Sequence, residues 1–276
     1  MNSIAGPISD HLGSKLDLRS RLSGPIETLG KLPKSLLFAE LSMLAYLPEH
    51  DAGLAAVEIG FADIRYLDRD GSQAYVFSNQ TDCVVACRGT EPNEWNDIKA
   101  DANAMTALAE TVGHVHRSFK REVDDLWPHI EEALVTNSKT LWFTGHSLGG
   151  AMATICAGRR MLSTISSNPR ELYTFGSPRV GNKRYINHCK VDYTRWVNNN
   201  DIVTRVPPAW LGYRHTGREV YIDARGRIRA LTDRRRTRDR WLGFVRALRR
   251  GKLDHFDDHS IHRYLECIRL AVEQDK

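Results

Sequence analysis

The sequence Leu-Trp-Phe-Thr-Gly-His-Ser-Leu-Gly-Gly at residues 141–150 decides how the rest of the chain is interpreted. The apolar run 141–143 is typical of a buried strand, and the small residues 151–157 that follow favour a helix. A Gly-x-Ser-x-Gly sequence between a strand and a helix predicts a sharp turn that lifts the Ser147 hydroxyl off the end of the strand. This arrangement is a nucleophile elbow.

Gly145, His146 and Gly149 complete the elbow around Ser147. Glycines tolerate the strained backbone and the close passage of neighbouring chain that such a turn requires. The helix N-terminus then offers free N–H groups and a partial positive charge near an oxyanion formed there. The motif alone is weak, since chance produces it in about one chain in ten of this length. The alternative is a glycine-rich turn in another α/β protein. Residues elsewhere in the chain that could act with Ser147 must distinguish the two.

Length and composition fit a globular chain of one large domain or two small ones. The chain has 276 residues, of which 41% are hydrophobic and 26% are charged. No apolar run approaches 18 residues and residues 1–7 lack a basic start, so we expect neither a transmembrane helix nor a secretory signal. The five cysteines show no disulfide or metal spacing. We therefore expect reduced thiols, a cytoplasmic location, and no metal or cofactor.

Predicted strands alternate with predicted helices along the chain. This pattern indicates an α/β fold with a central, mostly parallel sheet and helices on both faces. Residues 1–33 are polar and are expected to form an N-terminal arm, and 34–276 the domain. Pro128 predicts a kink or a break in its helix. The helices are expected at 34–46, 120–135, 182–188 and 260–272, and the strands at 63–67, 74–78, 82–87, 171–176, 193–197 and 219–222.

A serine needs an imidazole that takes its proton and a carboxylate that holds the imidazole in the right tautomer. In an elbow protein these partners follow in the order Ser, Asp or Glu, then His. Asp201 directly follows a predicted strand and fits the acid; its alternative role is an ordinary turn residue. His259 opens the last predicted helix, but the residues alone leave His255 and His262 open as bases. A further histidine, His215, is interpreted as structural or exposed.

Two backbone donors are needed where negative charge develops during ester cleavage. The N–H of Leu148, just after the serine, is one candidate. Thr90 is the other, because it comes directly after the predicted strand 82–87 and Gly89. The alternative is that residues 88–90 only end the strand.

These blocks, taken together, resemble the class 3 (fungal-type) lipases of the α/β-hydrolase fold. The resemblance covers most of the chain, from about residue 36 to about 270, and Tyr-Thr-Phe-Gly-Ser-Pro-Arg-Val-Gly is its most specific block. It implies Ser147, Asp201 and His259 as the catalytic triad and Thr90 and Leu148 as the oxyanion hole. The matching blocks are 88–90 with Trp95 and Asp97, 115–119, 144–150, 173–181, 195–207, and 258–260 with Tyr264.

The resemblance implies a serine hydrolase of acylglycerol-type lipid esters. Phospholipase A1 or short-chain esterase activity are alternatives, and a catalytically silent lipid- or partner-binding protein is the alternative of another class. Ser118 stands where the family usually has glycine; we expect the change to be tolerated, although a tight turn there can shift. The family's lid falls at about 95–112, where it is short and only modestly apolar. We therefore expect weak interfacial activation and a broader esterase character.

The segment 225–252 is a basic insertion outside the family pattern. It carries +10, so the rest of the chain carries −5 of the overall +5. Its apolar residues recur at helical spacing and predict a basic amphipathic helix, which is typical of a membrane-surface element. We expect it to bind anionic membranes or lipid droplets, or else to pack on the body as an arm; a nucleic-acid partner is not expected. The apolar residues are Trp241, Leu242, Phe244, Val245 and Leu248.

Overall fold

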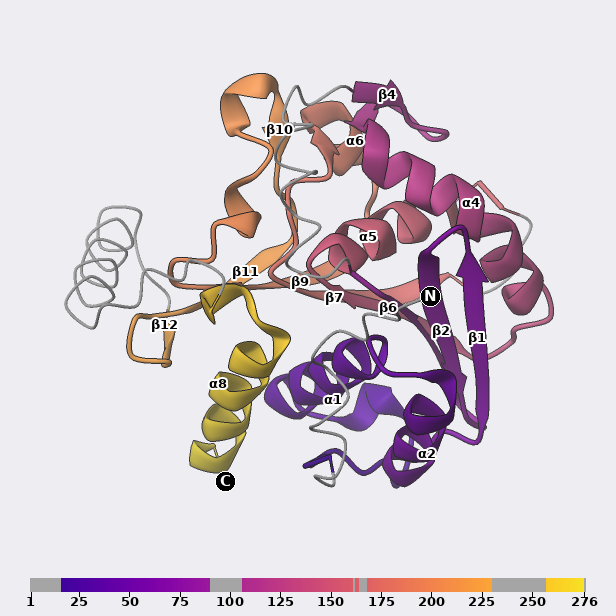
Figure 1. Ribbon diagram of the computed structural model, residues 1–276, viewed down its shortest axis with the longest axis vertical. Coiled ribbons are helices and arrows are strands. Elements are labelled where there is room, and N and C mark those ends of the chain that lie inside the picture. Colours follow the sequence, from indigo (N-terminus) through magenta and orange to yellow (C-terminus); the bar gives the residue numbers. More distant parts are fainter. Residues whose placement is uncertain (1–15, 90–105, 161, 164–167, 230–256, 276) are drawn as a thin grey trace, which may run out of the picture.

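The computed structural model describes residues 16–89, 106–160, 162–163, 168–229 and 257–275. Within these residues the chain forms an α/β fold around an eight-stranded sheet with the order β1-β2-β3-β6-β7-β9-β11-β12 (Figure 1). The strands are Asp63–Arg69 (β1), Ser72–Ser78 (β2), Asp82–Cys87 (β3), Thr140–His146 (β6), Pro169–Phe175 (β7), Asp192–Asn198 (β9), Arg218–Ile222 (β11) and Ile228–Arg229 (β12).

The five central strands, from β3 to β11, run parallel, which confirms the predicted fold class. Antiparallel strands close both edges: β1 and β2 on one side and β12 on the other. The turn between β1 and β2 contains Asp70 and Gly71, both with positive φ, which is typical of a tight hairpin turn. The parallel strands bring their carboxyl ends to one edge, where α/β folds place their sites.

Helices cover both faces of the sheet (Figure 1). One hydrophobic core joins the sheet to α1 (Lys31–Leu44), α2 (Glu49–Ile59) and α8 (Ile261–Gln274). The other core joins it to α4 (Arg117–Leu134) and α5 (Leu148–Arg160). Strand β6 serves both cores, since alternate side chains of a strand point to opposite faces. Trp142 lies in the first core, and Leu141 and Phe143 lie in the second.

Helix α4 continues through Pro128, so the predicted break does not occur. Pro128 is exposed on the outer side of the helix. The opposite side buries Val123, Leu126 and Ile130 against the sheet. Burial of such side chains contributes about 1.5–3 kcal/mol each, which offsets the roughly 3 kcal/mol that an interior proline costs a helix.

A second, small sheet lies beside α6 (Lys183–His188) and was not predicted. Its order is β10-β8-β5-β4, and it extends the α4–α5 side of the molecule (Figure 1). The strands are so short that period-2 alternation cannot be detected in them. They are Thr106–Leu108 (β4), His114–His116 (β5), Gly181–Asn182 (β8) and Tyr213–Arg214 (β10).

The described part of the expected N-terminal arm packs on the body. Leu18 and Ile26 are buried in the α1–α2–α8 core. The N–H of Ile26 donates to Asp82 at 3.0 Å, and the Trp142 indole N–H donates to the same carboxylate at 2.8 Å. Residues 16–33 therefore contribute to the core, which the interpretation of 1–33 as an arm did not predict, because the scattered apolar residues of this segment show no periodic pattern.

Several sequence predictions fall on residues outside the described part. These are the oxyanion candidate Thr90, most of the lid at 95–112, His255, and the amphipathic helix of the basic insertion. Among the described residues, no helix is long and apolar enough to cross a membrane.

Candidate active site

Ser147 lies between the end of β6 and the start of α5, at the carboxyl edge of the parallel strands. Its φ of 58° is in the left-handed region, where a non-glycine residue is strained. The Ser147 N–H donates to the Phe175 carbonyl of β7 at 2.9 Å, which helps to hold the strained residue in place. Ser147 therefore occupies a sharp strand-to-helix turn, the geometry that a nucleophile elbow requires.

The elbow glycines are required because backbone passes directly beside them. A Cβ on Gly145 would overlap the Gly149 carbonyl, and a Cβ on Gly149 would overlap the Cys87 carbonyl of β3. A Cβ on Gly89 would lie 2.7 Å from the His146 carbonyl and 3.2 Å from the Ser147 Cβ. Only glycine at these positions allows β3, β6 and the start of α5 to approach so closely.

Asp201 follows β9 and is fully buried. Its Oδ1 accepts from the Val203 N–H at 2.9 Å, and its Oδ2 accepts from the Tyr264 hydroxyl at 2.6 Å. A buried carboxylate needs such donors, because an unpaired charge is expensive to remove from water. The turn after β9 and helix α8 thus hold this side chain in one orientation.

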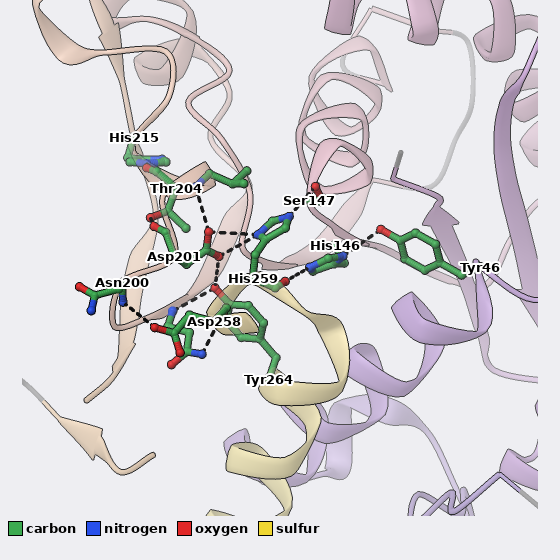
Figure 2. A network of polar contacts seen from close by, with 12 residues as sticks. Tyr46, His146, Ser147, Asn200, Asp201, Thr204, His215, Asp258, His259 and Tyr264 are labelled. Atoms are coloured by element: carbon green, nitrogen blue, oxygen red, sulfur yellow. Dashed lines mark hydrogen bonds and ion pairs between the residues drawn. The ribbon is translucent and has the colours of Figure 1, made fainter. Parts of the chain in front are cut away.

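His259 joins Asp201 to Ser147 (Figure 2). Its Nδ1 lies 3.0 Å from both Asp201 oxygens, and its Nε2 lies 2.8 Å from the Ser147 Oγ. A carboxylate only accepts hydrogen bonds, so Nδ1 carries the proton and Nε2 presents its lone pair to the serine hydroxyl. The three predicted triad residues thus meet in the order a serine nucleophile requires.

His215 and His262, the other described histidines considered from the sequence, are placed differently. The Nε2 of His215 is 2.7 Å from the Thr204 carbonyl, and burial lowers its pKa well below the ordinary value, with Arg195 nearby as a further cause. It is a structural histidine, in keeping with the interpretation of the sequence. His262 is exposed on α8.

Tyr264 and Asn198 support the triad and were not assigned roles from the sequence. The Tyr264 hydroxyl, fully buried, donates to Asp201 and accepts from the Asn198 N–H at 2.9 Å. Burial, reinforced by Asp201, raises the pKa of Tyr264 well above its ordinary value. The Asn198 side chain donates to the Asp258 carbonyl at 2.9 Å. Tyr264 lay in a recognised block, but nothing local to it signalled a contact with Asp201.

His146, expected only as an elbow residue, makes two contacts of its own. Its Nδ1 is 2.8 Å from the hydroxyl of Tyr46, which follows α1, and its Nε2 is 2.6 Å from the His259 carbonyl (Figure 2). Burial lowers the pKa of His146 well below its ordinary value, with His259 as the next cause. His146 is therefore neutral at physiological pH. Tyr46 was missed because it is 100 residues away in the sequence.

Leu148 is the first residue of α5, so its N–H lies at a helix N-terminus directly after Ser147. Arg159 and Arg160 occupy the last turn of α5, where their charge complements the helix dipole. Thr90 lies just outside the described residues, so its part in an oxyanion hole stays a prediction. Gly89, which precedes it, packs on the elbow as described above.

Comparisons of this chain with a family pattern, with known sequences and with solved structures all indicate the same family. The lipase (class 3) family pattern matches residues 84–210. Secreted mono- and diacylglycerol lipase 1 of Fusarium solani is 38% identical over 167 residues, which cover 56% of this chain and 49% of that protein. Secreted mono- and diacylglycerol lipase MDL2 of Malassezia globosa is 35% identical over 218 residues, which cover 67% of this chain and 68% of that protein.

A solved structure of a fungal lipase–inhibitor complex matches with a TM-score of 0.59 and 26% identity, over 70% of this chain and 80% of that chain. The chain spans about half or less of the length of the first curated relatives it matches. The match to the Malassezia protein nevertheless extends over two thirds of both proteins. The chain belongs to the class 3 lipase family, with the α/β-hydrolase fold.

Proposed function

We propose that the chain hydrolyses carboxylic esters of acylglycerol-type lipids, with Ser147 as nucleophile, His259 as general base and Asp201 as the residue that orients it. One observation carries the proposal: the Ser147 Oγ lies 2.8 Å from the His259 Nε2, whose ring partner Nδ1 contacts Asp201. A buried serine, histidine and aspartate in this order supply the base and the tautomer control that a serine nucleophile needs.

The first step forms an acyl-enzyme. His259 Nε2 takes the Ser147 proton while Oγ bonds to the ester carbonyl carbon, and the carbonyl electron pair moves to its oxygen. When that pair returns, the ester C–O bond breaks and the imidazolium gives its proton to the departing alkoxide, which leaves as the alcohol. Asp201 stabilises the imidazolium across the Nδ1 hydrogen bond.

Two N–H groups are proposed to stabilise the transient oxyanion. The Leu148 N–H stands at the start of α5, where the helix dipole also favours negative charge. The Thr90 N–H is the second proposed donor. One such donor contributes about 2.7–4 kcal/mol to the transition state in other serine hydrolases.

Water completes the cycle. His259 removes a proton from the water molecule, whose oxygen bonds to the acyl carbon, and the bond to Ser147 Oγ then breaks as Oγ takes the proton back. The products are a free fatty acid and the resting serine. The reaction as written uses the side chains and backbone N–H groups named here and water.

The substrate class rests on the relatives. Two of them are named as secreted mono- and diacylglycerol lipases. Acylglycerols are thus the substrates we propose first, with phospholipid sn-1 esters and short soluble esters as alternatives that the same chemistry serves.

The test is hydrolysis of nitrophenyl esters of graded acyl length and of emulsified mono-, di- and triacylglycerols. We expect activity in the wild type and none above background in Ser147→Ala. Ser23→Ala, at an exposed serine of the N-terminal segment, is the matched control and should keep full activity. A fluorophosphonate probe should label the peptide that contains Ser147. An inactive and unlabelled wild type would overturn the proposal in favour of a silent lipid-binding protein.

We also propose that the basic insertion 225–252 binds an anionic lipid surface. In its described part Arg227 and Arg229 each lie 3.5 Å from Asp223 and remain about half exposed, at 48% and 47%. Each arginine near an anionic membrane contributes roughly 1 kcal/mol of attraction. Sedimentation with phosphatidylserine-containing and neutral vesicles tests this, and equal binding to both would contradict it.

A cytoplasmic location, peripheral at a membrane surface, remains our proposal from the cysteines. All five lie in the described part of the chain and are free thiols, which suits a reducing compartment. The two named relatives are secreted proteins and lend the proposal no support. Fractionation of the source cells and their medium would test it; protein found only in the medium would overturn it.

A further inference from the structure

The backbone that carries His259 is held by side chains from two strands of the sheet. His146, at the end of β6, contacts the His259 carbonyl at 2.6 Å. Asn198, at the end of β9, donates to the Asp258 carbonyl at 2.9 Å. Two consecutive peptide groups are thus attached to the same sheet that carries Ser147 and Asp201.

The contacts of His146 fix its tautomer. A carbonyl oxygen can only accept, so the Nε2 of His146 carries the proton and donates to His259. Its Nδ1 is then an acceptor, and the Tyr46 hydroxyl, at 2.8 Å, must donate to it. The direction of both hydrogen bonds follows from the chemistry of the groups. Without Tyr46, the His146 ring would lose the partner that keeps Nδ1 unprotonated and the ring in this orientation.

We infer that Tyr46 and His146 are positioning residues that set the place of the His259 imidazole relative to Ser147, through the chain Tyr46 Oη–H to His146 Nδ1 and His146 Nε2–H to the His259 carbonyl. The inference deepens the proposed function and rests on it. Asp201 controls the imidazole from its ring side, and His146 controls the same residue from its backbone. The imidazole therefore has two independent constraints, one on each end of the residue.

The surroundings of His146 suit a positioning role. His146 is 6% exposed and His259 is 2% exposed, so water competes little for their hydrogen bonds. The centroids of the His146 and His259 rings lie 4.7 Å apart. A neutral His146 beside a base that must become positive during the reaction adds no repulsion, and its low pKa keeps it neutral. A Cβ at Gly89 would collide with the Tyr46 hydroxyl, so Tyr46 also contacts the loop that leads to Thr90.

The test compares three variants in steady-state ester hydrolysis. His146→Leu keeps bulk but removes donor and acceptor, and we expect kcat to fall about 100-fold with KM within about twofold, because a misplacement near 1 Å has that effect. His146→Gln keeps one donor and one acceptor and should recover kcat to within about tenfold of wild type. Tyr46→Phe should lower kcat about tenfold. Tyr66→Phe is the matched control, since its hydroxyl contacts Asp68 on the surface.

A second readout does not depend on activity. The His259 Nδ1 proton, shared with Asp201, should give a low-field proton resonance in nitrogen-15-labelled protein. The resonance should shift or broaden in His146→Leu and return in His146→Gln, which loss of fold alone would not produce. Thermal unfolding of each variant identifies any that fail to fold, in which case Tyr46→Phe and His146→Gln carry the test.

Unchanged kcat and unchanged resonance in His146→Leu would overturn the positioning role of Tyr46 and His146 while leaving the proposed hydrolase activity intact. A wild type inactive toward every ester would overturn the proposed function instead. The positioning role would then be tested by the resonance alone, which must shift or broaden in His146→Leu for the inference to stand.

Discussion

Ser147 and His259 meet at 2.8 Å, yet they are held in place by different forces. Ser147 is fixed by backbone sterics, with glycines at Gly145 and Gly149 that admit no Cβ. His259 is held by hydrogen bonds to side chains from elsewhere in the chain: its ring donates to Asp201, and its carbonyl accepts from His146. The serine's position is thus encoded locally, and the histidine's position is encoded by residues far apart in the sequence.

This difference predicts two kinds of damage. Steric errors at the elbow change the packing of β3, β6 and α5 and should appear as lost stability. Missing hydrogen bonds around His259 leave the fold in place and should appear as lost kcat. Each of the following changes tests one side of the contrast.

The largest effect is expected for Asp201→Asn, on the histidine side. An amide in place of the carboxylate can donate to Nδ1, which favours the wrong tautomer and leaves Nε2 unable to accept the serine proton. We expect kcat to fall about 10⁴-fold, or about 5.5 kcal/mol, with little change in thermal stability. Asp192→Asn, at the exposed start of the same strand β9, is the control. A fall below tenfold would show that Asp201 does not set the tautomer.

Gly149→Ala tests the serine side. The added Cβ would overlap the Cys87 carbonyl, which belongs to the rigid strand β3. We expect the free energy of unfolding to fall by about 3 kcal/mol, measured in urea. Gly53→Ala is the matched control, because nothing lies within 4 Å of its Cβ inside α2, and it should stabilise the protein by about 0.5–1 kcal/mol. Equal unfolding curves for the two variants would refute the steric account.

Tyr264→Phe should have an intermediate effect that appears on both measures. It removes a donor to Asp201 and an acceptor for the Asn198 N–H, both buried. We expect about 1–3 kcal/mol lower stability and a fall in kcat of about tenfold. Tyr75→Phe loses only a hydrogen bond to the Leu47 carbonyl and should keep kcat. If both variants keep wild-type kcat, Tyr264 does not orient Asp201.

The smallest effect concerns the pH dependence of stability. His146 and His215 have folded-state pKa values well below those of the unfolded chain, mainly through burial. Below about pH 6.5 the unfolded state binds more protons, so the free energy of unfolding should fall by up to about 1.4 kcal/mol per pH unit for each histidine. Chemical denaturation between pH 7.5 and 5 measures this slope. His215→Gln should reduce it and His188→Gln, at an exposed position of α6, should not; identical slopes in all three proteins would contradict the assignment.

The sequence predicted what is local or follows a fixed order. The elbow is ten consecutive residues, and Asp201 follows from the order of strands and triad residues. His259 could be preferred over His255 and His262 only through the family resemblance, since a loop's path across the sheet has no local signature. The roles of Tyr46, His146 and Asn198 were missed for the same reason. The short strands of the second sheet and the buried residues Leu18 and Ile26 lacked any periodic pattern.

The attachment of Asp258 and His259 to the sheet has a consequence for how this protein can vary. Asn198 and His146 reach the carbonyls of these two residues from the ends of β9 and β6, so the place of His259 is recorded in two strands that stand far before it in the chain. A substitution in either strand end can therefore alter the imidazole without touching the segment that carries it. Evolutionary change in His259 should for this reason be sought together with change at positions 146 and 198.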